Sequence, residues 1–149
     1  MGVSIVQLHG DADPVQLEIL KAAAPDLTVI KSLVAGRHDA AVLEALVASL
    51  SPHVDAFITD TFDPDTGASG ATGRTHDWTI SRRLVGISPR PVILAGGLTP
   101  ANVRQAILEV GPAGVDVHTG VEGADGRKDR GKVEAFVREA AAAFTQRRS

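Results

Sequence analysis

Cysteine is absent from the 149-residue sequence, which excludes disulfides, thiolate metal sites and cysteine catalysis within this chain. Aromatic residues make up only 3% of it and Met a single residue, so Val, Leu, Ile and Ala must fill the core. No apolar run approaches the roughly 18 residues that a membrane span needs. The formal net charge of −3 gives no sign of a nucleic-acid or anionic-membrane partner.

The hydrophobic content, 44% of 149 residues, is that of a globular α/β protein. A chain of this length can bury roughly two-thirds of its unfolded surface in one core. Met1 leads directly into an apolar segment, without the pattern of a signal peptide. We therefore expect a single domain over residues 1–149, located in the cytoplasm.

Short apolar runs alternate with helical patterns along the whole chain. The runs are continuous rather than alternating apolar and polar, which is typical of parallel strands covered by helices. The expected strands are residues 3–8, 27–32, 56–59, 91–95 and 114–117. The expected helices are residues 14–24 capped by Asp13, 39–50, a short one after Trp78, 100–109 capped by Thr99, and 130–145 preceded by Asp129.

This alternation predicts parallel βα units, which either close into a (β/α)8 barrel or form an open doubly wound sheet. No G-x-G-x-x-G pattern opens the first unit, which counts against a dinucleotide-binding sheet. Polar, glycine-rich segments follow the third, fourth and fifth strands, where barrel enzymes carry their active sites. Five units cannot close an eight-stranded barrel, so the sequence predicts a partial TIM barrel of about five βα units.

The first chemistry-bearing segment follows the third strand. Asp60 stands at the end of that strand, where a carboxylate is placed for acid–base work. The loop beyond it contains Gly70, Thr72 and Gly73, whose small side chains allow a ligand to approach closely. We expect this loop to contact substrate.

Two further segments predict a phosphate site. Gly96 and Gly97 follow the fourth strand and offer bare backbone N–H groups to an anion. Thr119 and Gly120 follow the fifth strand, with room for a short extra helix whose N-terminus faces the same anion. Two such segments after the last two strands form the phosphate site of many barrels.

Four motifs, taken in order, resemble the phosphoribosylanthranilate isomerase family of tryptophan biosynthesis. They are VQLHG, the strand-end TD with a later G-x-T-G-x-T-x-D-W, AGGLTPANV, and GVDVHTGVEGADGRKD. The resemblance runs from the family's fourth strand to its last helix, nearly the whole chain. It implies a (β/α)8 barrel that performs an Amadori rearrangement, opening a phosphoribosyl-amine to a 1-deoxyribulose phosphate. We expect neither a cofactor nor a metal.

The resemblance also implies roles. Asp60 matches the family's general acid, and the substrate phosphate maps onto Gly96, Gly97, Thr119 and Gly120. The family's base is a cysteine on strand one, and an arginine after strand two helps to hold the anthranilate carboxylate. Strands one to three have no counterpart here, so we expect the base to come from a missing N-terminal part.

This sequence departs from the family pattern at several positions. Gly70-Ala71 stands for the usual Gly-Gly, His76 for an aromatic residue, and His118-Thr119 for the usual Ser-Ser. His118, beside the phosphate loop, is therefore a candidate anion ligand or replacement base, and His9 a candidate ligand or replacement base. A histidine in either place can equally serve only in hydrogen bonding. Asp116, inside a strand-like run, is expected to be structural or to orient a ligand.

Other charged residues are given structural roles. The spacing of Asp63, Asp65 and Asp77 fits no standard calcium loop, so no metal is predicted there. Arg127 and Lys128 are expected to be solvated charges.

Two rival functions remain open at this stage. One is a phosphosugar-binding barrel fragment without turnover, and the other is an isomerase or epimerase of another small phosphosugar acting through His9 or His118. An unclosed barrel exposes the edges of its first and last strands, and such edges associate unless covered. We therefore expect a homo-oligomer or a complementary N-terminal half-barrel as partner, besides the phosphosugar itself.

Overall fold

The structure is a computed structural model that describes residues 2–35, 38–61 and 78–148. Its five parallel strands form one sheet in the order β1-β2-β3-β4-β5. The strands are β1 (Ile5–Leu8), β2 (Thr28–Ala35), β3 (Ala56–Thr61), β4 (Val92–Leu94) and β5 (Gly114–Val115). The helices are α1 (Pro14–Ala23), α2 (Ala40–Leu50), α3 (Trp78–Ile87), α4 (Val103–Val110) and α5 (Arg130–Gln146), with a 3₁₀ turn η1 at Thr119–Val121.

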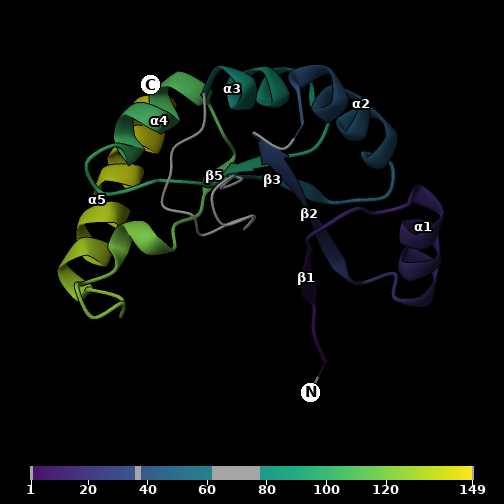
Figure 1. The fold of residues 1–149 in the computed structure, drawn as a ribbon, viewed down its shortest axis with the longest axis horizontal. Coiled ribbons are helices and arrows are strands. Elements are labelled where there is room, and N and C mark those ends of the chain that lie inside the picture. Colours follow the sequence, from purple (N-terminus) through teal and green to yellow (C-terminus); the bar gives the residue numbers. More distant parts are fainter. Residues whose placement is uncertain (1, 36–37, 62–77, 149) are drawn as a thin grey trace.

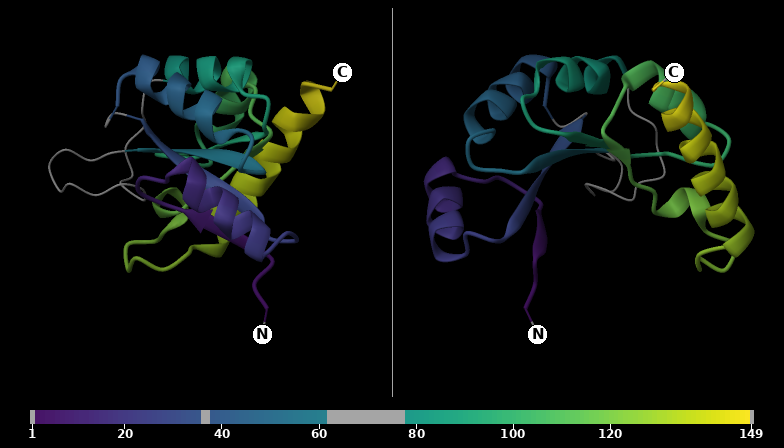
Figure 2. Two further views of the ribbon diagram at one scale, coloured as in Figure 1. Left: turned by 90° about the vertical axis from the view of Figure 1, so that its right-hand side faces the viewer. Right: turned by 180° about the vertical axis from the view of Figure 1, so that it is seen from behind.

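The sheet has the strand order of a barrel. Each strand pairs with the next one in the sequence, and the helices lie in an arc on the outer side of the strands (Figures 1 and 2). A doubly wound sheet would reverse its order and carry helices on both faces. The prediction of a partial (β/α)8 barrel of about five units is therefore confirmed.

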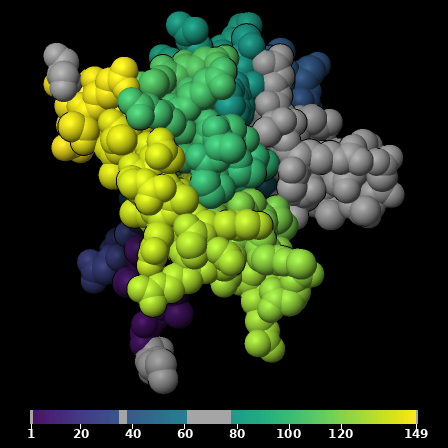
Figure 3. Space-filling model, turned by 90° about the vertical axis from the view of Figure 1, so that its left-hand side faces the viewer, coloured from purple at the N-terminus to yellow at the C-terminus, as the bar shows by residue number. Residues whose placement is uncertain are grey.

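The core lies between the strands and the arc of helices, in two clusters. The first joins β2 and β3 to α1, α2 and α3 and includes Leu17, Val29, Leu43, Phe57 and Leu84. The second joins β4 to α4 and α5, which lie side by side (Figure 3), and includes Leu94, Val103, Ile107, Phe136 and Ala140. Each fully buried Leu, Ile or Phe side chain contributes roughly 1.5–3 kcal/mol.

Three helices begin at aspartates that the sequence marks. The carboxylates of Asp13, Asp39 and Asp129 accept hydrogen bonds from the backbone N–H groups of Val15 (2.9 Å), Val42 (3.0 Å) and Lys132 (2.8 Å). The predicted cap at Asp13 is thus confirmed, as is the predicted start of the last helix directly after Asp129. Among the described residues no helix has both the length and the apolar character needed to cross a bilayer.

The predicted start of α4 is wrong. Residues 100–102 form a turn, and the helix begins at Val103 after Asn102 rather than at Pro100 after Thr99. The Thr99 carbonyl accepts from the N–H groups of both Asn102 (3.2 Å) and Val103 (3.0 Å). The side chain of Asn102 is used by the preceding loop and makes no cap hydrogen bond.

Strand ends also differ from prediction, because pairing partners decide them. β2 continues to Ala35, since Val34 and its neighbours pair with the end of β3 at Asp60. β5 ends at Val115 rather than at residue 117, because only Gly114 and Val115 pair with β4. The early end of β5 frees residues 116–120 to turn across the end of the sheet.

Candidate functional site

The carboxyl ends of β3, β4 and β5 enclose a cavity of about 30 Å³. Its lining comes from Asp60, residues 95–98 and residues 116–120. The structure therefore brings the sequence-predicted acid, Asp60, together with all four predicted phosphate residues, Gly96, Gly97, Thr119 and Gly120. The structure shows that these residues line one cavity. Their roles in acid catalysis and phosphate binding stay predictions.

Asp60 lies at the end of β3, in register with Val34 of β2, and only 7% of the residue is exposed. Its carboxyl group is thus shielded from bulk water yet belongs to a residue that lines the cavity. A general acid needs this placement, since it must pass its proton to a bound ligand rather than to solvent.

The loop after β4 is shaped by two glycines and one asparagine. Gly96 (φ 96°) and Gly97 (φ 63°) adopt left-handed backbone conformations, which side chains disfavour. The amide oxygen of Asn102 accepts from the Thr99 N–H (2.8 Å), and its amide nitrogen donates to the Gly97 carbonyl (3.0 Å). The sequence analysis did not predict these two hydrogen bonds, although an asparagine three residues after Thr99 is a signal for them.

The loop after β5 touches the first loop backbone to backbone. A Cβ atom added at Gly120 would lie 1.8 Å from the Leu98 carbonyl oxygen, so no side chain fits there. Thr119 and Gly120 open the 3₁₀ turn η1, which confirms the short helix predicted at this place. The loops after β4 and β5 are thus in contact, and both line the cavity.

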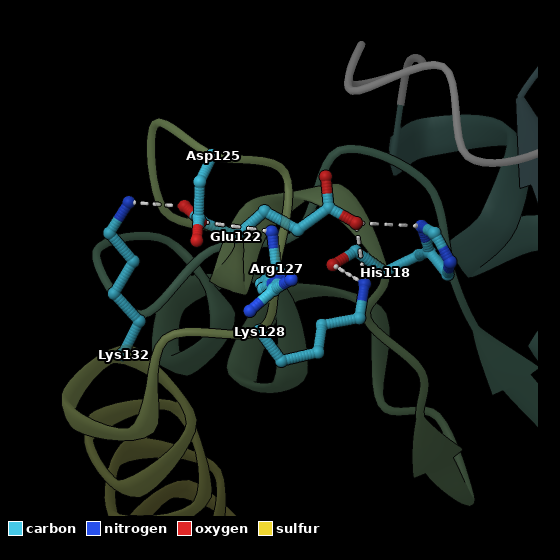
Figure 4. A network of polar contacts seen from close by, with 6 residues as sticks. All are labelled: His118, Glu122, Asp125, Arg127, Lys128 and Lys132. Carbon is cyan, nitrogen blue, oxygen red and sulfur yellow. Dashed lines mark hydrogen bonds and ion pairs between the residues drawn. The ribbon is translucent and has the colours of Figure 1, made fainter.

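A small ionic network flanks the cavity at His118 (Figure 4). The imidazole Nδ1 lies 3.4 Å from a carboxylate oxygen of Glu122, and the Lys128 ammonium lies 2.7 Å from that same oxygen. Lys128 also donates to the His118 carbonyl (2.8 Å), and Lys132 donates to the Glu122 carbonyl (2.6 Å). The hydrogen bond from Lys128 lowers the pKa of the Glu122 carboxyl. The side chain of Lys128 is 44% exposed, so it is a solvated charge as predicted, and it also pairs with Glu122.

His9, the other candidate base, does not line this cavity. It follows β1, with its Nδ1 3.4 Å from the Ser32 hydroxyl, to which the Gln7 side chain donates at 3.1 Å.

Asp116 does line the cavity. The predicted substrate-loop residues Gly70, Thr72 and Gly73 lie outside the described residues, as do the aspartates at 63, 65 and 77. Within the described ranges no three His, Asp or Glu side chains gather as a metal site would require.

A buried lysine, which the sequence did not reveal, lies toward the β1 edge of the sheet. Lys31 of β2 is 5% exposed, and its ammonium donates to the carbonyls of Gly10 and Ser32, both at 2.7 Å. Burial lowers the pKa of this amine. The lysine ties the loop after β1 to β2, beside a cavity of about 170 Å³ that is separate from the one at Asp60.

Comparison with known sequences finds one family. A family model described as N-(5'phosphoribosyl)anthranilate (PRA) isomerase matches residues 1–139. The isomerase of Haloferax volcanii is 45% identical over 147 residues, which are 99% of this chain and 61% of the relative. Isomerase 2 of Methanosarcina mazei is 44% identical over 142 residues, 93% of this chain and 60% of the relative. The chain thus spans about three fifths of the length of these curated relatives.

Solved structures agree. Phosphoribosyl anthranilate isomerase from Thermotoga maritima superposes with a TM-score of 0.72 at 31% identity, covering 94% of this chain and 62% of that one. The enzyme from Thermococcus kodakaraensis gives a TM-score of 0.68 at 36% identity, with 91% and 62% covered. A further such isomerase (TM-score 0.68, 28% identity, 94% and 60% covered) was solved in complex with reduced 1-(o-carboxyphenylamino)-1-deoxyribulose 5-phosphate.

Proposed function

The chain belongs to the N-(5'phosphoribosyl)anthranilate (PRA) isomerase family, and on that basis we propose that it carries the acid and phosphate parts of an isomerase active site. The substrate is N-(5'-phosphoribosyl)anthranilate and the reaction an Amadori rearrangement in tryptophan biosynthesis. One observation carries this proposal: Asp60 shares its cavity with the two glycine-containing loops that would hold a phosphate. A cytoplasmic location and a single domain remain predictions.

The backbone of the two loops holds the substrate phosphate, which fixes the sugar relative to β3. Asp60 then protonates the ring oxygen as the bond from that oxygen to C1 breaks. A base removes the C2 proton, and the resulting enol-amine tautomerises to the ketone. Neither proton transfer changes the oxidation state of the substrate as a whole, so the chemistry needs only an acid and a base.

The base comes from outside these 149 residues in this proposal. The resemblance assigns that role to a cysteine on the family's first strand, and this sequence has no cysteine. His9 does not line the Asp60 cavity. His118 lies among the phosphate-loop residues, a position that favours contact with the phosphate over the role of base. A separate polypeptide or further chain carrying the remaining βα units would supply the base.

The test is isomerisation of the substrate by this chain, alone and mixed with the first three βα units of the Haloferax volcanii relative. We expect Asp60→Asn to lower kcat on the order of 10²-fold or more, because the acid is lost, while phosphate binding is retained. Asp26→Asn, an exposed aspartate before β2, serves as matched control. Equal turnover by the Asp60→Asn variant and the unmodified chain would refute the role of Asp60.

A second function is a phosphosugar-binding module without turnover. It is favoured by one observation, namely that the proposed phosphate residues lie in this chain whereas the family's cysteine base does not. Phosphosugar binding without turnover, both by the chain alone and by the mixture with the βα units of the relative, would support it. Turnover of another small phosphosugar, lost in His118→Ala or His9→Ala, would instead support the remaining alternative.

A partner for the exposed strand β1 belongs to the same proposal. β1 is at one edge of the sheet, and Ile5 on it is 57% exposed. We expect either a second copy of the chain or a complementary half-barrel to cover it. In sedimentation velocity, Ile5→Lys should shift the chain toward monomer, and Ile87→Lys, at the exposed end of α3, should not. A chain that stays monomeric at high concentration, with or without the complementary units, contradicts this partner.

A further inference from the structure

The cavity at the ends of β3, β4 and β5 has an unusual charge for an anion site. Among the described residues, its lining holds two carboxylates, Asp60 and Asp116, and no Lys or Arg. A phosphate dianion placed there would meet backbone N–H groups but also two side chains that repel it when ionised. Of the lining residues that the structure describes, His118 is the one whose side chain can carry a positive charge.

The neighbours of His118 hold its side chain and its backbone in place. Its Nδ1 lies 3.4 Å from the Glu122 carboxylate, and the side chain is 61% exposed (Figure 4). Lys128 pairs with Glu122 and also donates to the His118 carbonyl, which fixes the backbone at the start of η1. Because Glu122 and Lys128 cancel each other, protonation of His118 changes this cluster from neutral to a net charge of +1.

We propose that His118, as an imidazolium, is the cationic ligand of the phosphate in this site and makes anion binding depend on pH. This inference rests on the proposed phosphate site and adds a ligand to it. The charged groups around the imidazole are Glu122 and Lys128 on its own loop, with Asp60 and Asp116 in the cavity.

Sulfate is a suitable probe, because it stays a dianion between pH 6 and pH 8.5. A phosphate monoester, by contrast, changes its own charge near pH 6. Histidine side chains ordinarily titrate near pH 6.5, and aspartates near pH 4. Across this range a change in sulfate affinity therefore reports histidine protonation and not the carboxylates. Affinity should rise as the pH falls, since the imidazolium attracts the anion and the neutral ring does not.

The experiment titrates the ¹⁵N-labelled chain with sulfate at pH 6 and pH 8.5 and follows the amide signals of Gly96, Gly97 and Gly120. We expect affinity to be about tenfold weaker at pH 8.5. His118→Ser should abolish this pH dependence, and His53→Ser, in the turn after α2, should keep it. At pH 7, sulfate should also move the imidazole C–H signals of His118 toward their protonated positions, a response that a purely structural histidine would not give.

The outcomes separate the two proposals. Sulfate binding that is equal at both pH values, or a pH dependence that survives in His118→Ser, overturns this inference and leaves the proposed function standing. Sulfate that moves none of the loop amides at either pH overturns the phosphate site and this inference together. Since the side chain of His118 is mostly exposed, the serine variant is expected to fold, and the imidazole signals of the unmodified chain test the same point without a substitution.

Discussion

The two edges of the sheet are built in different ways. Beyond β5, backbone contacts hold the chain: the Asp129 N–H donates to the Val121 carbonyl at 2.8 Å, and the Val121 side chain is buried. At the β1 edge, Ile5 is exposed, and the loop after β1 is tied to β2 by the side chain of Lys31. The proposed phosphate site lies toward the β5 edge, and β1 is the edge for which we propose a partner.

The two regions should also fail in different ways. The loops after β4 and β5 meet through backbone atoms, so few side-chain substitutions alter their shape, but an added Cβ at the contact does. The region around β1 and β2 depends on ionised groups in partly buried positions, so it responds to charge and pH.

The largest effect is expected from Gly120→Ala. The new Cβ would lie 1.8 Å from the Leu98 carbonyl oxygen, so the two loops must separate. We expect sulfate affinity to fall at least about tenfold and the free energy of unfolding to fall by about 1–3 kcal/mol. Sulfate titration and urea unfolding measure the two quantities.

Gly86→Ala is the matched control for that substitution. Gly86 lies in α3, and its added Cβ would have no atom within 4 Å. Replacing a helical glycine with alanine should leave sulfate binding unchanged and raise stability by up to about 1 kcal/mol. If Gly120→Ala kept full sulfate affinity, the contact between the loops would not shape the site.

A smaller effect is expected from Asp55→Asn, on the side of the sheet away from the phosphate loops. The Asp55 carboxylate accepts from the Val29 N–H (2.7 Å) and from the Lys21 ammonium (2.9 Å). The Val29 hydrogen bond and then that of Lys21 lower the pKa of Asp55 below its ordinary value. A lowered carboxyl pKa stabilises the fold above pH 4 or so, and that stability is lost as the pH falls toward the folded-state pKa.

Because the Asp55 side chain is 39% exposed, solvent screening reduces the effect. We expect Asp55→Asn to lower the free energy of unfolding by about 1 kcal/mol at pH 7 and by less at pH 3, with sulfate affinity unchanged. Urea unfolding at both pH values measures this, with Asp26→Asn as control. A loss that is equal at pH 7 and pH 3 would contradict the ionic origin of the stabilisation.

Local signals made much of the fold predictable. Apolar runs separated by helices give a parallel sheet, and Asp13 and Asp129 mark helix starts because a carboxylate satisfies free N–H groups there. The residues that line the site could also be predicted. Asp60 and the glycines stand at the ends of strands, and a barrel brings these ends together.

Contacts between segments distant in the sequence could not be read in this way. The reason for Gly120 is the carbonyl of Leu98, which only the folded loops bring near. In the sequence Lys31 looks like a surface lysine, but the loop at Gly10 buries it. The contacts of Lys128 with Glu122 and with the His118 carbonyl likewise form only in the folded loop. The predicted ends of β2 and β5 were wrong for the same reason, because pairing with the neighbouring strand decides where each of them ends.

The most direct test of the central claim is an amide chemical-shift map of the ¹⁵N-labelled chain with reduced 1-(o-carboxyphenylamino)-1-deoxyribulose 5-phosphate, the ligand of a solved relative. The account predicts that the signals of Asp60, Gly96, Gly97, Thr119 and Gly120 shift together, with those of Gly10 and Ser32 little changed. Shifts confined to Gly10, Ser32 and their neighbours, with the β4 and β5 loops unmoved, would contradict it.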